Sequence, residues 1–231
     1  MSLKSFLSKF FLGREVLTKI NSPINGEIRV CEDLFGRREM LVGKIPQSGG
    51  LVSKLWKEGL RLIKKEEGKK QKPKKNKECL ILGLGAGTLA KQMAQEFGGS
   101  RIVGIEKDPQ VIRLGRKYFA LGEIPNLKIV IDDAFENLKK QKTKFDLIIV
   151  DLYFGQEFPP EAESNKFFKD ILKLIGPDGL VVFNRLYFNQ EQRDQADEFV
   201  RQVAEFFPWV KTKRLVTNLL ILASIEAKNK V

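Results

Sequence analysis

Three acidic residues in the second half of the chain follow predicted strands, where their carboxylates could meet in one binding site. Glu106, Asp133 and Asp151 lie at or just after the carboxyl ends of these strands. The apolar runs that predict the strands span residues 101–106, 127–131 and 145–150. In an open parallel sheet these strand ends share the edge at which ligands bind. Three acids in this order therefore indicate a ligand site rather than unrelated helix caps.

Each acid suits a different part of a nucleoside. Glu106 suits a ribose, whose hydroxyl groups donate hydrogen bonds to a carboxylate at the tip of the second strand. Asp133, followed by Ala134, suits an adenine amino group. Asp151 comes after the strand expected beside the first one, so it would lie near the reacting end of the ligand.

A glycine-rich turn comes before the acids and supplies the backbone half of such a site. A strand over residues 79–82 leads into the sequence GLGAGT, which contains Gly83, Gly85 and Gly87, and a predicted helix follows. Glycine lets the backbone approach a ligand closely, and the first turn of a helix presents unpaired N–H groups. Glu106 comes 19 residues after Gly87, as in a nucleoside-binding βαβ unit.

The composition excludes several kinds of chemistry. The 231 residues contain no histidine, which excludes Ser-His and Cys-His catalysis and most zinc sites. Cys31 and Cys79 are far apart, without metal-ligand spacing, and are typical of a reduced, cytoplasmic protein. We therefore expect no metal, and a general base among Asp, Glu, Lys and Tyr.

Strand and helix patterns alternate from residue 78 onward, which predicts a parallel sheet with helices on both faces. The last two strands, over residues 210–216 and 219–227, are separated by only Thr217 and Asn218. So short a link cannot make a parallel crossover, so this pair must be an antiparallel hairpin. We expect an α/β Rossmann-like domain over residues 78–231, with a mostly parallel seven-stranded sheet and this C-terminal hairpin.

The N-terminal part is expected to form three segments. Residues 1–24 are an amphipathic segment, too short and too often interrupted by charges to span a membrane. Its helical stripe of apolar residues comprises Leu3, Phe6, Leu7, Phe10 and Phe11. A helix packed on the protein or on a second subunit is favoured over an interfacial membrane helix. Residues 25–63 are predicted to form a small β region and then a helix over 51–63.

The segment Lys64–Lys77 is a lysine-rich loop. It holds eight lysines against Glu66 and Glu67, so half of the net charge of +12 lies in it. A contact with nucleic acid is one interpretation. A solvated loop is favoured, because no aromatic residues alternate with the lysines to stack on bases.

Residues 78–227 resemble the class I S-adenosylmethionine-dependent methyltransferase fold, and within it are most similar to the polyamine aminopropyltransferases, the spermidine and spermine synthases. The sequence NGEIRV at 25–30 and the sequence REMLVGKIPQ at 38–47 resemble that family's N-terminal hairpins and the glutamine after them. The sequence FDLIIVD at 145–151 resembles the strand that leads into its gatekeeping loop.

The resemblance implies roles for individual residues. Gln47 and Glu106 would contact the nucleoside and Asp133 the adenine. Asp151 would accept a proton from the attacking amine, and Tyr153 would shape the pocket or hydrogen-bond the amine. It also implies decarboxylated S-adenosylmethionine as co-substrate, a small-molecule amine as acceptor, and a homo-oligomer formed through the N-terminal β structure.

Two acids of that family are missing here. The family has an aspartate in the glycine turn, where this chain has Ala86, and another in the loop after Asp151. Three loop glutamates are candidate substitutes: Glu157, Glu161 and Glu163. The turn itself is closer to methyltransferases, which bind intact S-adenosylmethionine.

Three functions therefore stay open. The first is an aminopropyl transferase, which predicts a pocket lined with acids. The second is a methyltransferase acting on a small molecule or RNA; for RNA, basic residues should continue from the pocket to the lysine-rich loop. The third is a non-catalytic nucleoside-binding module, which requires Asp151 to be buried or turned away.

Overall fold

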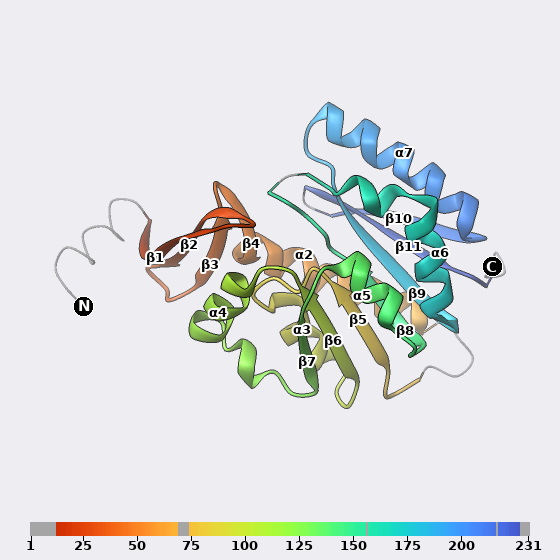
Figure 1. Ribbon diagram of the computed structural model, residues 1–231, viewed down its shortest axis with the longest axis horizontal. Coiled ribbons are helices and arrows are strands. Elements are labelled where there is room, and N and C mark those ends of the chain that lie inside the picture. Colours follow the sequence, from red (N-terminus) through yellow and green to blue (C-terminus); the bar gives the residue numbers. More distant parts are fainter. Residues whose placement is uncertain (1–12, 69–73, 156, 216, 227–231) are drawn as a thin grey trace.

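The computed structural model describes residues 13–68, 74–155, 157–215 and 217–226, which form two β-sheets with helices around the larger one (Figure 1). The larger sheet has the order β10-β11-β9-β8-β5-β6-β7. Its strands are β5 (Glu78–Leu82), β6 (Arg101–Glu106), β7 (Leu127–Ile131), β8 (Phe145–Val150), β9 (Ile175–Leu186), β10 (Trp209–Leu215) and β11 (Asn218–Ser224). β11 pairs antiparallel with β9 and β10, and the pairs from β9 to β7 are parallel. The predicted sheet and its closing hairpin are confirmed.

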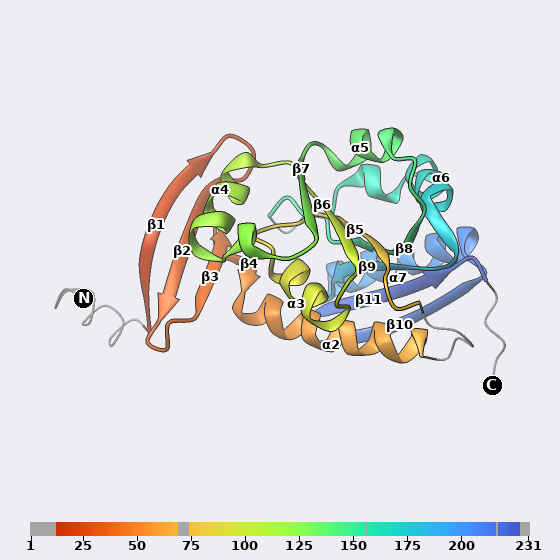
Figure 2. The same ribbon diagram turned by 90° about the horizontal axis from the view of Figure 1, so that it is seen from below.

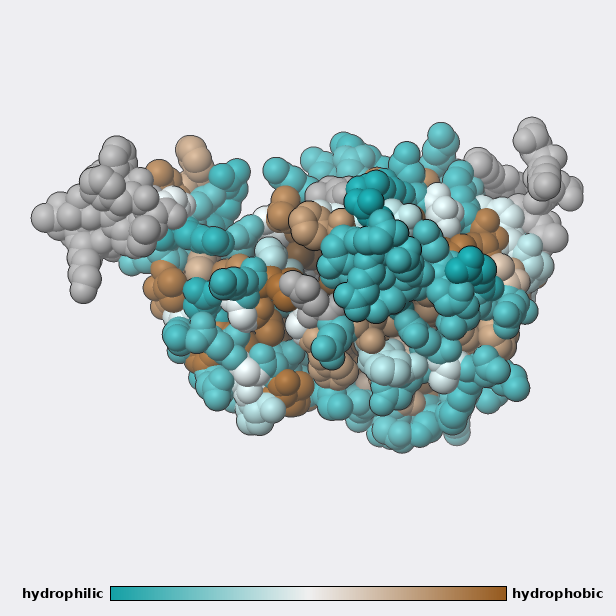
Figure 3. All heavy atoms as spheres, turned by 90° about the horizontal axis from the view of Figure 1, so that it is seen from above, coloured by the Kyte–Doolittle hydropathy of each residue, from teal (hydrophilic) through white to brown (hydrophobic). Residues whose placement is uncertain are grey.

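Helices cover both faces of this sheet (Figures 1 and 2). The helices are α2 (Gly50–Glu67), α3 (Thr88–Glu96), α4 (Pro109–Tyr118), α5 (Ala134–Lys140), α6 (Asn165–Leu174) and α7 (Gln190–Phe206). Side chains alternate along each strand, so Cys79 and Ile81 pack with α2 and α3, whereas Leu80 and Leu82 pack with α5, α6 and α7. The outer side of α7 is hydrophilic (Figure 3).

The smaller sheet is antiparallel, in the order β1-β2-β3-β4. Its strands are β1 (Arg14–Ser22), β2 (Gly26–Asp33), β3 (Arg38–Val42) and β4 (Ile45–Gly49). The helix favoured for the N-terminal amphipathic segment is wrong for residues 14–20, which belong to β1. A bulge between Val16 and Thr18 interrupts the period of two, so the residues that reach the core, Leu17 and Ile20, are three apart as in a helix. Residues 3–11 lie outside the described part of the chain.

The smaller sheet packs against the carboxyl edge of the larger one, next to α4 (Figure 1). The apolar contact joins residues of β2 and β3 to the glycine turn and to α4, namely Ile28, Val30, Met40, Val42, Ala86, Val111 and Leu114. A polar contact lies beside it: Oδ2 of the buried Asp108 accepts hydrogen bonds from Ser22 Oγ and, at 2.7 Å, from Asn25 Nδ2. The N-terminal sheet is thereby fixed over the ligand-binding edge.

The lysine-rich segment begins inside a helix. α2 continues to Glu67, so Lys64 and Lys65 are helical rather than part of a loop. Lys64 pairs with Glu96 at 2.8 Å. Across the described ranges, no helix combines the length and the apolar character that a membrane crossing needs.

The buried hydrogen bonds to Asp108 predict a measurable contribution to stability. In Asp108→Asn the amide presents an N–H group to the donors Ser22 and Asn25, while its oxygen can still cap α4. We expect the free energy of unfolding to decrease by about 1–3 kcal/mol, measured by denaturant titration. Asp194→Asn, on the exposed side of α7, should change it by less than about 0.5 kcal/mol. Equal effects of the two substitutions would contradict this role.

Candidate active site

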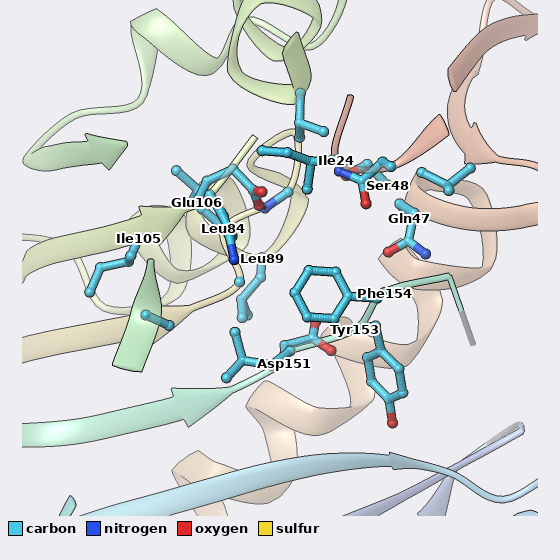
Figure 4. A pocket seen from close by; sticks show the side chains of 18 of the residues that line it. Ile24, Gln47, Ser48, Leu84, Leu89, Ile105, Glu106, Asp151, Tyr153 and Phe154 are labelled. Carbon is cyan, nitrogen blue, oxygen red and sulfur yellow. The ribbon is translucent and has the colours of Figure 1, made fainter. Parts of the chain in front are cut away.

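A cavity lies at the carboxyl ends of the central parallel strands, beside the end of β4 (Figure 4). The predicted site residues that line it are Gln47, Gly83, Gly85, Glu106, Asp133, Ala134, Asp151 and Tyr153. Gly87 lies elsewhere: it begins α3 with φ of 90°, and a Cβ there would lie 2.4 Å from Cδ1 of Leu121. The conformation and packing of the turn therefore require Gly87, but it does not face the cavity.

Close backbone contacts fix the glycine turn. Gly83 has φ of 88°, and a Cβ there would lie 2.1 Å from the carbonyl oxygen of Asp151. Glycine is therefore the residue that fits this position. Gly85 has φ of 57°, and its N–H donates to Oε2 of Glu106 at 3.0 Å. The turn is held between the ends of β6 and β8.

Glu106 is a half-buried carboxylate in the cavity wall. Its Oε2 accepts from Gly85 N and its Oε1 accepts from Asp108 N, each at 3.0 Å. Burial raises the pKa of this carboxyl above its usual value, and the backbone N–H groups oppose the rise. A carboxylate has about four acceptor positions, so Glu106 can still accept bonds from the hydroxyl groups of a ribose.

Asp133 caps α5 and already has a cationic partner. Its Oδ1 accepts from the N–H groups of Phe135 and Glu136, and its Oδ2 lies 3.0 Å from Lys107 Nζ. Burial acts to raise the pKa of Asp133, but Lys107 and the helix N–H groups outweigh it, and the pKa lies below its usual value. An adenine amino group at this position would have to share Oδ2 with Lys107.

Asp151 lines the cavity at the carboxyl end of β8, with both carboxylate oxygens hydrogen-bonded. Its Oδ2 accepts from the indole N–H of Trp56 at 3.1 Å, and its Oδ1 accepts from Asn184 Nδ2 at 2.7 Å. Burial raises the pKa of Asp151 to about 6, although both hydrogen bonds act to lower it. Such a carboxylate is ionised at neutral pH, yet it is a stronger base than an exposed aspartate.

A row of buried amides orients Asp151 from behind. Asn218 Nδ2 donates to Oδ1 of Asn184 at 2.9 Å, and Thr217 Oγ1 donates to Oδ1 of Asn218 at 3.1 Å. Each amide thus donates toward Asp151 and accepts from the residue behind it. Because every hydrogen bond in this row is donated toward Asp151, the residue at its end must accept, and the ionised carboxylate of Asp151 does so.

Tyr153 contributes its ring to the cavity, but its hydroxyl points away (Figure 4). The hydroxyl donates to the carbonyl oxygen of Asn184 at 3.0 Å and accepts from Leu186 N at 2.7 Å. Burial raises the pKa of Tyr153 above its usual value. Of its two predicted roles, shaping the pocket fits this geometry, and hydrogen bonding to an amine does not. Gln47 lies across the cavity, with its Nε2 3.3 Å from the carbonyl oxygen of Gly155.

Position 86, where the resembled family has an aspartate, does not line the cavity. Ala86 is 1% exposed and packs against the N-terminal sheet and α4. Its N–H donates to Oγ of the buried Ser48 at 3.0 Å. The local packing thus accounts for a small apolar side chain at this position.

The loop glutamates do not replace the missing acids in the cavity. Among the described residues that line it, none of the three is present. Glu163 lies 2.7 Å from the buried Arg185, on the side of α7. Glu157 lines a separate groove beside the same helix.

Sequence reasoning missed two residues that hold Asp151. Neither Trp56, which lies in the helix predicted over residues 51–63, nor Asn184 is among the predicted site residues. A tryptophan on a buried face needs an acceptor for its indole N–H, and an amide that follows the apolar run 180–183 needs partners as well. The indole N–H and the amide, each in need of a hydrogen-bond partner, were therefore the features of the sequence that could have pointed to these two residues.

Charge separates this cavity from the lysine-rich segment. The cavity wall contains four acids, Glu106, Asp132, Asp133 and Asp151, and one cation, Lys107. At the other end of the sheet two lysines pair with acids: Lys74 with Asp146 at 2.8 Å, and Lys77 with Glu67. None of the described lysines of this segment lines the cavity. The described chain also has no group of three or more acidic or sulfur side chains that could hold a metal.

The order of the strands and the position of the cavity define the class I methyltransferase-like fold, and solved structures share it. A probable spermidine synthase from Corynebacterium glutamicum matches with a TM-score of 0.74 at 21% identity, over 91% of this chain and 79% of that one. Human methyltransferase-like protein 13, solved in complex with SAH, matches with a TM-score of 0.60 at 18% identity, over 68% of this chain and 75% of that one.

The family is shown by a match to the spermine/spermidine synthase domain, which covers residues 67–230. The chain belongs to this family. A polyamine aminopropyltransferase from Pyrobaculum islandicum is 29% identical over 161 residues, which are 63% of this chain and 55% of that protein. An eEF1A lysine and N-terminal methyltransferase homolog from Drosophila melanogaster is 28% identical over 160 residues, which are 64% of this chain and 23% of that protein. The matched part is thus 23% of the length of one of these relatives and 55% of the other.

The raised pKa of Asp151 predicts a specific pH dependence of stability. The folded-state pKa of about 6 exceeds the ordinary value of 3.8, so the folded protein binds a proton more tightly than the unfolded chain does. The stabilisation from this group is therefore complete below about pH 4 and is lost as the pH rises through about 6, by up to about 3 kcal/mol. Denaturant titrations of the wild type and Asp151→Asn across this range should show the difference between them changing. A constant difference would contradict the raised pKa.

Proposed function

We propose that the chain transfers an aminopropyl group from decarboxylated S-adenosylmethionine to an amine, with Asp151 as the proton acceptor. The observation that carries the proposal is the position of Asp151. Its carboxylate lies in the same cavity wall as the glycine turn and Glu106, and it is held by Trp56 and Asn184. Membership of the spermine/spermidine synthase domain family supports the same reaction.

The reaction needs few protein groups, because a sulfonium carries its own leaving group. An alkylamine has a pKa near ~10.4 and arrives as an ammonium ion. Asp151 attracts this cation and takes one proton from it, which frees the nitrogen lone pair. The nitrogen then attacks the aminopropyl carbon that is bonded to the sulfonium sulfur. A C–N bond forms, the bond between this carbon and sulfur breaks, and its electron pair stays on sulfur. The products are a secondary ammonium ion and methylthioadenosine, and the remaining task of the protein is to align the reactants.

The nucleoside would lie against the glycine turn. Glu106 would accept hydrogen bonds from the ribose and Asp133 from the adenine, with Ala134 beside it and Gln47 across the cavity. Two solved structures with a similar fold support a nucleoside ligand. Human methyltransferase-like protein 13 was solved with SAH, and a spermidine synthase was solved with the transition-state analogue AdoDATO. No metal takes part in this scheme.

A methyltransferase is the second candidate, and two observations favour it. Ala86 replaces the aspartate of the glycine turn, and the Drosophila relative is named a methyltransferase. The acidic cavity and its separation from the lysines oppose an RNA substrate. A non-catalytic module, the third alternative, is opposed by the exposure of Asp151 to the cavity. The homo-oligomer and the cytoplasmic location stay predictions.

Calorimetry with three nucleosides distinguishes the first two candidates. We expect decarboxylated S-adenosylmethionine and methylthioadenosine to bind at least about tenfold more tightly than intact S-adenosylmethionine, because the cavity has no described cation at the Asp151 end to pair with the extra carboxylate. Tighter binding of intact S-adenosylmethionine would exclude the aminopropyl transferase and favour the methyltransferase.

Substitution of Asp151 tests its role as the proton acceptor. Asp151→Asn keeps the side-chain shape but removes the base, so kcat should fall by about 10²–10⁴, while the Kd for methylthioadenosine changes less than about threefold. Asp170→Asn, on the outer side of α6, is the matched control and should keep full activity. Retained turnover in Asp151→Asn would show that Asp151 is not the proton acceptor.

The pH profile tests the same assignment independently. In the wild type, kcat/KM should fall below about pH 6 as Asp151 becomes protonated. Trp56→Phe removes one of the two hydrogen bonds that lower this pKa, so the acidic limb should move to higher pH. An acidic limb that stays in place in Trp56→Phe would show that another group titrates.

A further inference from the structure

A second cavity meets the first one at Asp151. The two share Gln47, Val52, Asp151 and Tyr153 in their walls. The rest of the second wall comes from β4, the start of α2, the end of β9 and the turn before β11. These residues are Ile45, Pro46, Leu51, Leu55, Gly155, Asn184, Leu186, Thr217 and Asn218. The glycine turn lines the first cavity and is absent from the wall of the second, so an amine in the second cavity would reach Asp151 without contacting the turn.

The wall of the second cavity is mainly apolar and carries one charge. Asp151 is the charged residue among the described residues that line it. The polar groups near Asp151 are engaged with one another, because Thr217, Asn218 and Asn184 form the row of hydrogen bonds that ends on its carboxylate. The wall therefore presents aliphatic side chains to the remainder of a bound amine.

Acids near this region point elsewhere. Glu163 pairs with Arg185, and it lines the groove beside α7 together with Glu157. Tyr153 separates that groove from the second cavity, since its ring lines both and its hydroxyl is bound to the backbone of β9. A second ammonium group in the second cavity would thus gain no carboxylate from the described wall to offset the water molecules it loses there.

We propose that the second cavity binds the acceptor, and that the acceptor is a primary amine on an uncharged alkyl stem rather than a diamine. This inference rests on the proposed function for the reaction, but it makes a separate statement about the substrate. The stem would pack on Leu51, Leu55 and Leu186, and the single ammonium group would pair with Asp151. A free alkylamine and a lysyl side chain share this chemistry.

Calorimetry on the full chain tests the proposal without turnover. The titrants are n-pentylamine and 1,5-diaminopentane, which have equal chain lengths, and the protein is used both free and saturated with methylthioadenosine. We expect n-pentylamine to bind at least about tenfold more tightly. Nα-acetyl-lysine N-methylamide distinguishes the two sources of the amine: tighter binding of this compound than of n-pentylamine supports a lysyl side chain. Equal or tighter binding of the diamine, or no binding of any of the amines, would overturn the proposal.

A substitution at the outer end of the cavity tests its location. Leu51 is 50% exposed in the first turn of α2, where an added carboxylate is compatible with the helix N-terminus. Leu51→Asp should tighten the binding of diamines with four to six carbons by about tenfold relative to monoamines, and Leu51→Asn should leave the preference as in the wild type. No difference between the two variants would show that the amine binds elsewhere.

Transfer assays with decarboxylated S-adenosylmethionine separate the two proposals. If the protein binds n-pentylamine as expected but releases no methylthioadenosine, the proposed function is wrong and the inference about the acceptor stands. If the protein transfers the aminopropyl group to 1,5-diaminopentane with a higher kcat/KM than to n-pentylamine, the proposed function stands and the inference about the acceptor is wrong.

Discussion

The contact between Gly83 and Asp151 is the constraint on which the site depends. The Asp151 N–H donates to the carbonyl oxygen of Leu82 at 2.8 Å, which continues the pairing of β5 and β8 beyond the strands. The carbonyl oxygen of Asp151 then occupies the space that a Cβ on Gly83 would need. Because one backbone contact joins the nucleoside turn to the acid, the reacting end of a bound nucleoside and the proposed base cannot shift independently. Every other feature of the cavity is arranged around this fixed pair.

The N-terminal sheet completes the site and explains a departure from the resembled family. β4 brings Gln47 to the cavity and Ser48 to the turn, where Ser48 accepts from the N–H of Ala86. Ala86 is then covered by side chains of β2, β3 and α4. A charged residue at position 86 would be buried in this contact unless the sheet moved away. The loss of the acid and the close packing of the smaller sheet are therefore parts of one arrangement.

The sequence could predict the features that depend on local pattern, and it failed where partners come from distant segments. The alternation of strands and helices and the C-terminal hairpin follow from short-range rules and are confirmed. β1 was missed because the helical stripe at residues 3–11 was extended to the residues that follow it, which form a strand from Arg14. Gly87 was placed in the site because a glycine turn is assigned as a unit, yet its position is required by Leu121, 34 residues later. The direction of the Tyr153 hydroxyl depends on β9, which no local pattern near residue 153 reveals.

The apolar surroundings of Asp151 connect its strength as a base to the kind of amine that the cavity can hold. Burial raises the pKa of Asp151 to about 6, just low enough for the carboxylate to be ionised at neutral pH. A second carboxylate in the same wall, such as one that would hold the far end of a diamine, would raise this pKa further by repulsion between like charges. In the wall of the second cavity Asp151 is the one charged residue among the described residues, and it matches a proposed acceptor that carries a single positive charge.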